Sequence, residues 1–224
     1  DSGLHVARVM QQTCAEALGV PPRRVAVGST GIIGVQLDPD FMTGATRTAT
    51  EAIAAGQGPT FARAIMTTDR FPKECALEVG LTEGTVRLGM CAKGAGMIAP
   101  AMATMLCMVT TDAILHPAAA ETLLRDAVTD TFNKVTVDGE MTTNDAVYFL
   151  ASGASGIRPQ GADREHFAAA LRTLLRRASL MLVADGEGAT KIMRVTVKGA
   201  GDSQTATRVC RAVADSPLVK TAMH

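Results

Sequence analysis

The 224-residue sequence has few aromatic side chains, with no Trp, one Tyr and six Phe. Proteins that bind single-stranded nucleic acid stack the bases on exposed aromatic rings, and this chain has few such rings to offer. The chain also has no excess of charge of either sign, because 22 Lys and Arg residues balance 22 Asp and Glu residues. A neutral chain lacks the positive field that steers nucleic acid onto a protein surface. We therefore expect no nucleic acid among the partners.

Paired cysteines and clustered histidines are also missing. The five Cys contain no C-x-x-C pair, and the four His contain no H-x-x-x-H pair. An odd number of scattered Cys argues against a disulfide framework, and the spacing of both residue types argues against a zinc site. The sequence predicts a protein of a reducing compartment that holds no metal.

Long hydrophobic runs are limited to one uncharged stretch of 18 residues at 94–111, which reaches the lower limit for a membrane span. Gly94, Gly96 and Pro100 interrupt this stretch. Backbone groups beside Gly and Pro would lack hydrogen-bond partners in lipid, so we expect no membrane span. From the first residues, Asp1-Ser2-Gly3, we also expect no signal peptide.

The composition that remains is typical of a globular protein, with 47% hydrophobic and 20% charged residues. No change in composition along the chain marks a domain boundary. Hydrophobic periodicity predicts helices over 5–18, 41–55, 118–132, 144–151, 163–184 and 203–214. It predicts strands over 25–27, 75–79, 85–90, 105–109, 135–137 and 192–197, with a hairpin loop at 80–84. Intermixed helices and strands indicate a mixed α/β class with a mixed sheet.

Candidate chemistry has to work without a histidine base, because all four His occupy positions typical of surface residues. A Thr at a chain N-terminus can use its own α-amine as the base, and self-cleavage can create such a terminus. Thr104 fits in outline, because Ala103 before it is small and Pro100 restricts the chain upstream. Thr30 and Gly31 could supply oxyanion donors. On the residues alone, an ordinary strand Thr and an ordinary Gly-rich turn remain alternatives.

Several segments together resemble the glutamate N-acetyltransferase (ornithine acetyltransferase) family of arginine biosynthesis. They occur in family order along nearly the whole chain, at residues 29–34, 64–69, 93–106 with 110–113, 132–145, 185–191 and 216–222. The central one reads Lys-Gly-Ala-Gly-Met-Ile-Ala-Pro-Ala-Met-Ala-Thr-Met-Leu over 93–106. No single motif decides the assignment, but the ordered set is specific.

The resemblance implies an N-terminal-nucleophile acyltransferase with the layered α/β/β/α, DmpA-like fold. It implies cleavage between Ala103 and Thr104, so that 1–103 belong to an α chain and 104–224 to a β chain of one family region. Thr104 then carries acetyl from N-acetylornithine to glutamate, with Thr30 and Gly31 as the oxyanion hole. Substrate-binding positions match Thr67, Lys93, Thr104 and Glu187.

The resemblance also implies no organic cofactor, acetyl-CoA as a possible second donor, and an α₂β₂ heterotetramer. It places the enzyme in the cytoplasm, or in the mitochondrial matrix of a eukaryote. The sequence departs from the family pattern at Arg70 and at Glu140-Met141. Full family members have roughly 400 residues, so the chain resembles their central portion. An aminopeptidase with the same machinery and an inactive structural fragment remain the alternatives.

Overall fold

The computed structural model describes residues 2–32, 34–99 and 105–224, and the chain divides into two units, 1–61 and 62–224. In the first unit, α1 (Ser2–Leu18) packs against α2 (Pro39–Glu51), and the short η1 (Pro22–Arg24) lies between them in sequence. The Asp38 carboxylate caps α2 by accepting the N–H groups of Asp40 and Phe41. The helix α3 (Gly58–Ala64) leads into the second unit.

The second unit is built on a four-stranded mixed sheet in the order β1-β2-β3-β4. Its first two pairs are antiparallel and its last pair is parallel. The strands are β1 (Lys73–Leu81), β2 (Gly84–Lys93), β3 (Leu106–Thr111) and β4 (Ala146–Ala151). The mixed α/β class with a mixed sheet is therefore confirmed.

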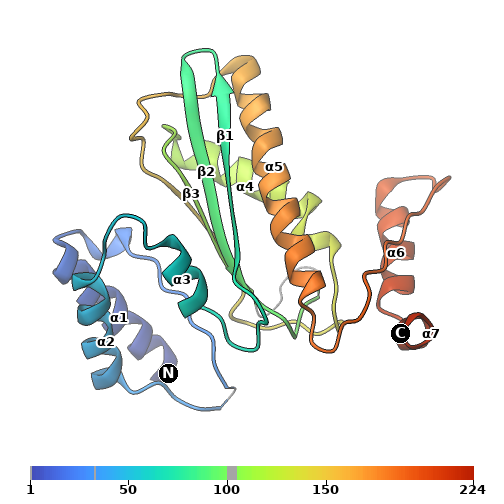
Figure 1. Ribbon diagram of the computed structural model, residues 1–224, viewed down its shortest axis with the longest axis horizontal. Coiled ribbons are helices and arrows are strands. Elements are labelled where there is room, and N and C mark those ends of the chain that lie inside the picture. Colours follow the sequence, from blue (N-terminus) through green and yellow to red (C-terminus); the bar gives the residue numbers. More distant parts are fainter. Residues whose placement is uncertain (1, 33, 100–104) are drawn as a thin grey trace. The chain divides into compact units, whose positions relative to one another are not determined.

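Two helices cover one face of this sheet. The long α5 (Gly161–Ala184) runs along β1 and β2, and α4 (Pro117–Asp130) packs beside α5 and contacts β4 (Figure 1). Alternate residues of each strand point into this layer, so that Val86, Leu88 and Met90 are buried against Phe167 and Leu171. The remaining elements of the unit are η2 (Phe132–Lys134), α6 (Ser203–Ala214) and α7 (Pro217–Met223).

Several predicted elements are confirmed, including the long helix 163–184, the helix 203–214 and the strand near 105–109. The hairpin is confirmed, but its strands extend farther and leave a two-residue turn at Thr82 and Glu83. Gly84 makes this tight turn possible because its φ of 140° is unfavourable for residues with a Cβ.

Other element predictions are wrong. The segment 144–151, predicted as a helix, contains β4, because Val147 and Phe149 alternate into the core beside β3. The segments 25–27, 135–137 and 192–197, predicted as strands, form no strand. Within the described chain they find no sheet partner, and Val137 N–H instead donates to Ile98 O at 2.7 Å. None of the described helices is long and apolar enough to cross a membrane.

Candidate active site at one end of the sheet

The sheet topology gathers distant segments at one end of the second unit. Because β1 and β3 both run antiparallel to β2, they begin where β2 ends, and β4 begins beside β3. The register pairs Lys73 with Ala92, and Lys93 with Leu106, which in turn pairs with Ala146. We call this end of the sheet, opposite the β1–β2 turn, the site end.

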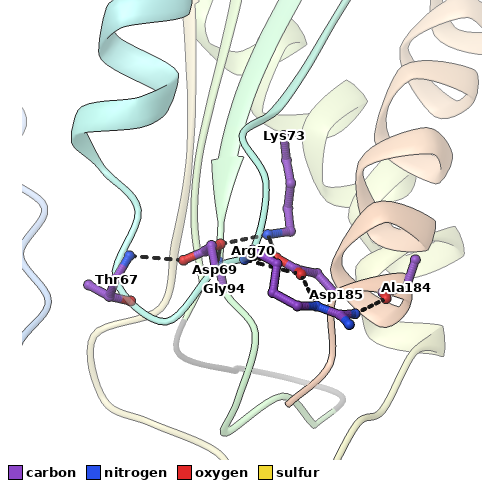
Figure 2. Close-up of polar contacts among 7 residues, drawn as sticks. All are labelled: Thr67, Asp69, Arg70, Lys73, Gly94, Ala184 and Asp185. Atoms are coloured by element: carbon purple, nitrogen blue, oxygen red, sulfur yellow. Dashed lines mark hydrogen bonds and ion pairs between the residues drawn. The ribbon is translucent and has the colours of Figure 1, made fainter. Parts of the chain in front are cut away.

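A buried ionic network lies at the site end (Figure 2). The Lys73 Nζ lies 2.6 Å from Asp69 Oδ1 and 2.5 Å from Asp185 Oδ2, and all three side chains are fully buried. Arg70 donates from its backbone N–H and its Nε to Asp185, and from another nitrogen to Ala184 O, at the end of α5. The network therefore ties the start of β1 to the C-terminus of α5.

Both carboxylates in this network are held in the charged form. Burial alone would raise the pKa of Asp69, but hydrogen bonds from Gly94, Lys73 and Thr67 outweigh it and lower that pKa. Burial likewise works to raise the pKa of Asp185, and the hydrogen bonds from Lys73 and Arg70 lower it overall. The Lys73 ammonium thus compensates two buried negative charges, and the Arg70 guanidinium also compensates that of Asp185.

Asp69 also connects two of the predicted substrate-binding residues. Its Oδ2 accepts the Thr67 N–H at 3.0 Å, and its Oδ1 accepts the N–H of Gly94, next to Lys93, at 2.7 Å. Lys93 is the last residue of β2 and is only 2% exposed. Burial lowers the pKa of Lys93, and the nearby charges of Asp69, Asp145 and Glu187 partly oppose this shift.

Glu187 reaches the same place from the loop after α5. Its N–H donates to Ala95 O at 2.7 Å, and its carboxylate lies against Gly96, where a Cβ would come within 2.8 to 3.0 Å of it. A side chain at position 96 would therefore displace the Glu187 carboxylate. The structure brings Thr67, Lys93 and Glu187 together around the turn that follows β2.

A further carboxylate, Asp145, lies at the start of β4. Its Oδ1 accepts the Met105 N–H at 2.7 Å and the Thr142 hydroxyl at 3.0 Å. Burial raises the pKa of Asp145 to about 6, although these hydrogen bonds and the charge of Lys93 pull the other way. The ionised form is thus disfavoured in the folded chain.

This raised pKa predicts a pH-dependent cost to stability. The contribution of protonated Asp145 to the free energy of unfolding is fully present below the ordinary pKa of 3.8. It is lost as the pH rises through about 6, because the folded chain keeps the Asp145 proton to a higher pH than the unfolded chain does. We expect the free energy of unfolding to fall by about 1 to 3 kcal/mol from this group, with partial burial taken into account. Urea unfolding of Asp145→Asn and wild type from pH 4 to 8 should give a difference in favour of the variant that grows with pH. Parallel pH curves would contradict the prediction.

Not every predicted site residue can be placed with the others. Thr30 and Gly31 lie in the loop after η1 in the first unit, with Thr30 half-buried and Gly31 exposed. Ala103 and Thr104 lie outside the described residues. Met105 and Leu106 are described, and they put the chain after Thr104 at the site end. Within 2–32, 34–99 and 105–224, no three His, Cys, Asp or Glu side chains are grouped so as to hold a metal ion.

Sequence reasoning missed Lys73, Asp69, Asp185 and Asp145 as functional candidates, although three of them lie inside the motifs. The i, i+4 spacing of Asp69 and Lys73 was an available signal for an ion pair. Burial of that pair depends on the end of α5, which is more than 100 residues away in sequence. The sequence pattern alone therefore could not identify the pair as buried.

Comparison with known proteins places the sequence of this chain in a family. The family model described as ArgJ family matches residues 1–224. The arginine biosynthesis bifunctional protein ArgJ of Nitratidesulfovibrio vulgaris is 48% identical over 224 residues, which is 100% of this chain and 57% of the relative. The glutamate N-acetyltransferase of Methanocaldococcus jannaschii is 42% identical over 99% of this chain and 56% of its own length.

Among solved structures, the arginine biosynthesis bifunctional protein ArgJ of Bacillus halodurans matches with 38% identity and a TM-score of 0.49. The match covers 52% of this chain and 56% of that one. The chain spans somewhat more than half the length of the curated relatives it matches. Because the family model covers every residue, the chain belongs to the ArgJ family.

Proposed function

We propose that this chain carries the reaction centre of an acetyltransferase that moves acetyl from N2-acetyl-L-ornithine to L-glutamate. The observation that carries the proposal is the register at the site end, where Lys93 is paired with Leu106, two residues after Thr104. Thr67 and Glu187 come to the same place from other segments. Family membership and the names of the relatives support the same activity.

The proposed reaction begins with self-cleavage. The Thr104 hydroxyl oxygen attacks the Ala103 carbonyl carbon, and the peptide C–N bond breaks as the nitrogen takes up the hydroxyl proton. Water then hydrolyses the resulting ester, which leaves a carboxylate on Ala103 and a free amine on Thr104. That amine becomes the base for the next step.

Acetyl transfer then proceeds in two halves. Thr104 Oγ attacks the acetyl carbon of N-acetylornithine, its proton passes to the Thr104 amine, and the ornithine nitrogen leaves with that proton. The glutamate α-amine then attacks the acetyl carbon of the acetyl-Thr104 ester, and the bond from that carbon to Thr104 Oγ breaks. The proton lost by the glutamate amine passes through the Thr104 amine to Oγ, which returns Thr104 to its hydroxyl form. Thr30 and Gly31 are proposed to stabilise the oxyanion in both halves, as the family resemblance implies.

The charges at the site end fit these substrates. N-acetylornithine carries an α-carboxylate and a side-chain ammonium, and we propose that Lys93 pairs with the former and Glu187 with the latter. Thr67 is proposed to contact substrate beside them. The chemistry requires no metal or organic cofactor, and acetyl-CoA is proposed as a second acetyl donor.

The family resemblance also extends the proposal beyond one chain. We propose that the cleaved pieces assemble as an α₂β₂ heterotetramer and that the enzyme acts in the cytoplasm.

An acceptor-dependence assay tests this function. Incubation with N-acetylornithine and glutamate should give equal amounts of ornithine and N-acetylglutamate, because the acetyl group passes from one amine to the other. Without glutamate, ornithine release should stop after about one equivalent per active site, when Thr104 is acetylated. Ornithine release at the same rate without glutamate, accompanied by acetate, would instead support the aminopeptidase-like hydrolase. A parallel incubation with acetyl-CoA and glutamate tests the second donor.

A further inference from the structure

A large cavity lies beside the candidate active site in the second unit. Its volume is about 780 Å³, and it is lined by residues 130–137, the C-terminal half of α5, the loop 187–195 and the helices α6 and α7. Cavities of a few hundred to about 1,000 Å³ are the size that holds small organic ligands. Glu187 lines this cavity and also lies against Gly96 at the site end. The cavity therefore adjoins the candidate active site, with Glu187 in common.

The charged side chains around this cavity are mostly positive. Lys134 is paired with Asp130 at 2.8 Å, and Glu187 is the other acid among the described lining residues. Five further cations line the cavity, and none of them forms an ion pair with a described residue: Arg176, Lys191, Arg194, Arg211 and Lys220. In a chain whose total charge is zero, this local excess favours an anionic ligand.

Two of these cations reach from the C-terminal helices to the backbone that follows α4. A terminal nitrogen of Arg211, on α6, donates to Asn133 O at 3.0 Å, and Lys220 Nζ, on α7, donates to Val137 O at 2.7 Å. Each carbonyl oxygen accepts a hydrogen bond but carries no net charge. Both side chains are thus fixed at the cavity wall with their positive charge uncompensated.

The Nε of Arg211 is the unusual feature of this wall. It is buried and donates to no described residue. A buried donor without an acceptor is costly, and native structures contain few. Because Arg211 lines the cavity, an anion bound there would supply the missing acceptor. This nitrogen therefore indicates a ligand independently of the charge excess.

Phosphate groups suit this lining better than a single carboxylate does. Arg presents a planar fork of N–H donors that matches the oxygens of a phosphate, and Lys supplies a compact positive charge. A phosphate group carries about 1.5 to 2 negative charges near neutral pH, so more than one is needed to balance five cations. The volume of the cavity also leaves room for an organic group beside the phosphates.

We propose that this cavity binds an organic ligand that carries a diphosphate group, and that Arg211 Nε donates to one of its phosphate oxygens. Coenzyme A and a nucleoside diphosphate share this chemistry. Coenzyme A would occupy the cavity as part of the proposed second acetyl donor, whereas a nucleoside diphosphate would act as an effector beside Glu187. The inference goes beyond the proposed function, which gives none of the five cations a role.

Isothermal titration calorimetry of the chain with coenzyme A and, separately, with ADP tests the inference. We expect at least one probe to bind with a Kd below about 1 mM, and its affinity to fall as the NaCl concentration rises. Arg211→Met should weaken binding by about 10-fold or more, because a charge-assisted hydrogen bond to phosphate is lost. Tighter binding of coenzyme A than of ADP would identify the acetyl donor as the ligand, and the reverse order would identify a nucleotide effector.

Arg208→Met is the matched control. Arg208 is also on α6, but its side chain is exposed, donates to the Thr205 hydroxyl of the same helix and does not line the cavity. We expect Arg208→Met to bind the probe as wild type does. Equal weakening in the two variants would overturn the inference, because the effect would then come from the total charge of the chain.

The remaining outcomes also decide. No binding of either probe to wild type, or an unchanged affinity in Arg211→Met, would overturn the inference. Should Arg211→Met not fold, Arg194→Met decides, because this exposed side chain can be shortened without unfolding the chain. We expect Arg194→Met to weaken binding by about 2- to 5-fold, as loss of one exposed charge predicts, and an unchanged affinity would then overturn the inference.

The binding assay also separates this inference from the proposed function. A wild-type chain that binds a probe but transfers no acetyl group from N-acetylornithine would refute the proposed function and leave the inference standing. A wild-type chain that transfers this acetyl group but binds neither probe would refute the inference alone.

Discussion

Replacing Thr104 with Ala should leave the chain in one piece and reduce acetyl transfer by about 10³-fold or more. The loss is large because one residue is proposed to supply two groups, the hydroxyl nucleophile and, after cleavage, the amine base. Removing the hydroxyl prevents the cut, and without the cut there is no free amine. Intact mass measures the first effect, and ornithine release in the presence of glutamate measures the second.

Two other variants make the Thr104 result specific. Thr104→Ser retains a hydroxyl and should still cleave, because the same atom can attack Ala103. Thr110→Ala removes an exposed Thr from the same stretch of chain, within β3, and should behave as wild type. A Thr104→Ala chain that still separates into fragments 1–103 and 104–224 would rule out Thr104 as the nucleophile.

Replacing Lys73 with Met should lower the free energy of unfolding by about 3 to 5 kcal/mol. The side chain would still fill its space, but Asp69 and Asp185 would lose the ammonium that they share inside the protein. Arg70 would remain on Asp185, and among the described residues Asp69 would keep the backbone N–H donors of Thr67 and Gly94. Urea denaturation at neutral pH measures the loss.

Lys134→Met is the matched control for Lys73→Met. Lys134 pairs with Asp130 at 2.8 Å with the same i, i+4 spacing, but both side chains are about half exposed. We expect this variant to lose about 0.5 kcal/mol or less, since solvent screens an exposed pair. Similar losses in the two variants would show that burial of Lys73 contributes little.

Acid should reduce the difference between wild type and Lys73→Met. The pKa values of Asp69 and Asp185 are lowered in the folded chain, so their contribution is present above the ordinary value of 3.8. It is lost as the pH falls through the lowered values, because both carboxyls then take up protons. The two unfolding curves should therefore approach each other as the pH falls toward the lowered values.

The parts of the fold that the sequence predicts well are those governed by local pattern. Alternation defines the β1–β2 hairpin, and a long amphipathic run defines α5. The short apolar run of β4 fits either period, and the sequence predicts a helix there. Its pairing with β3, which lies some 40 residues earlier, decides the outcome. The segment 192–197 alternates as a strand does, but a strand also needs a neighbour.

The candidate site divides in the same way. Thr67, Lys93 and Glu187 came from the resemblance to a family, and no periodicity in the sequence brings them together. The antiparallel and parallel pairings do so, because they place the starts of β1, β3 and β4 at the same end of the sheet as the end of β2. Asp145 and Lys73 are recognisable only once burial is known, since an Asp or Lys in a sequence is ordinarily a surface residue.

The pairing of β2 with β3 has a consequence for the cleaved protein. The proposed cut falls between these two strands, which lie side by side over six registered residue pairs, from Leu88–Thr111 to Lys93–Leu106. The α and β pieces would therefore remain paired in one sheet through β2 and β3, and they would share one hydrophobic core after the peptide bond is cut. The cut creates a new N-terminus for catalysis while the sheet that positions it stays folded. We expect the two pieces to separate only in denaturant.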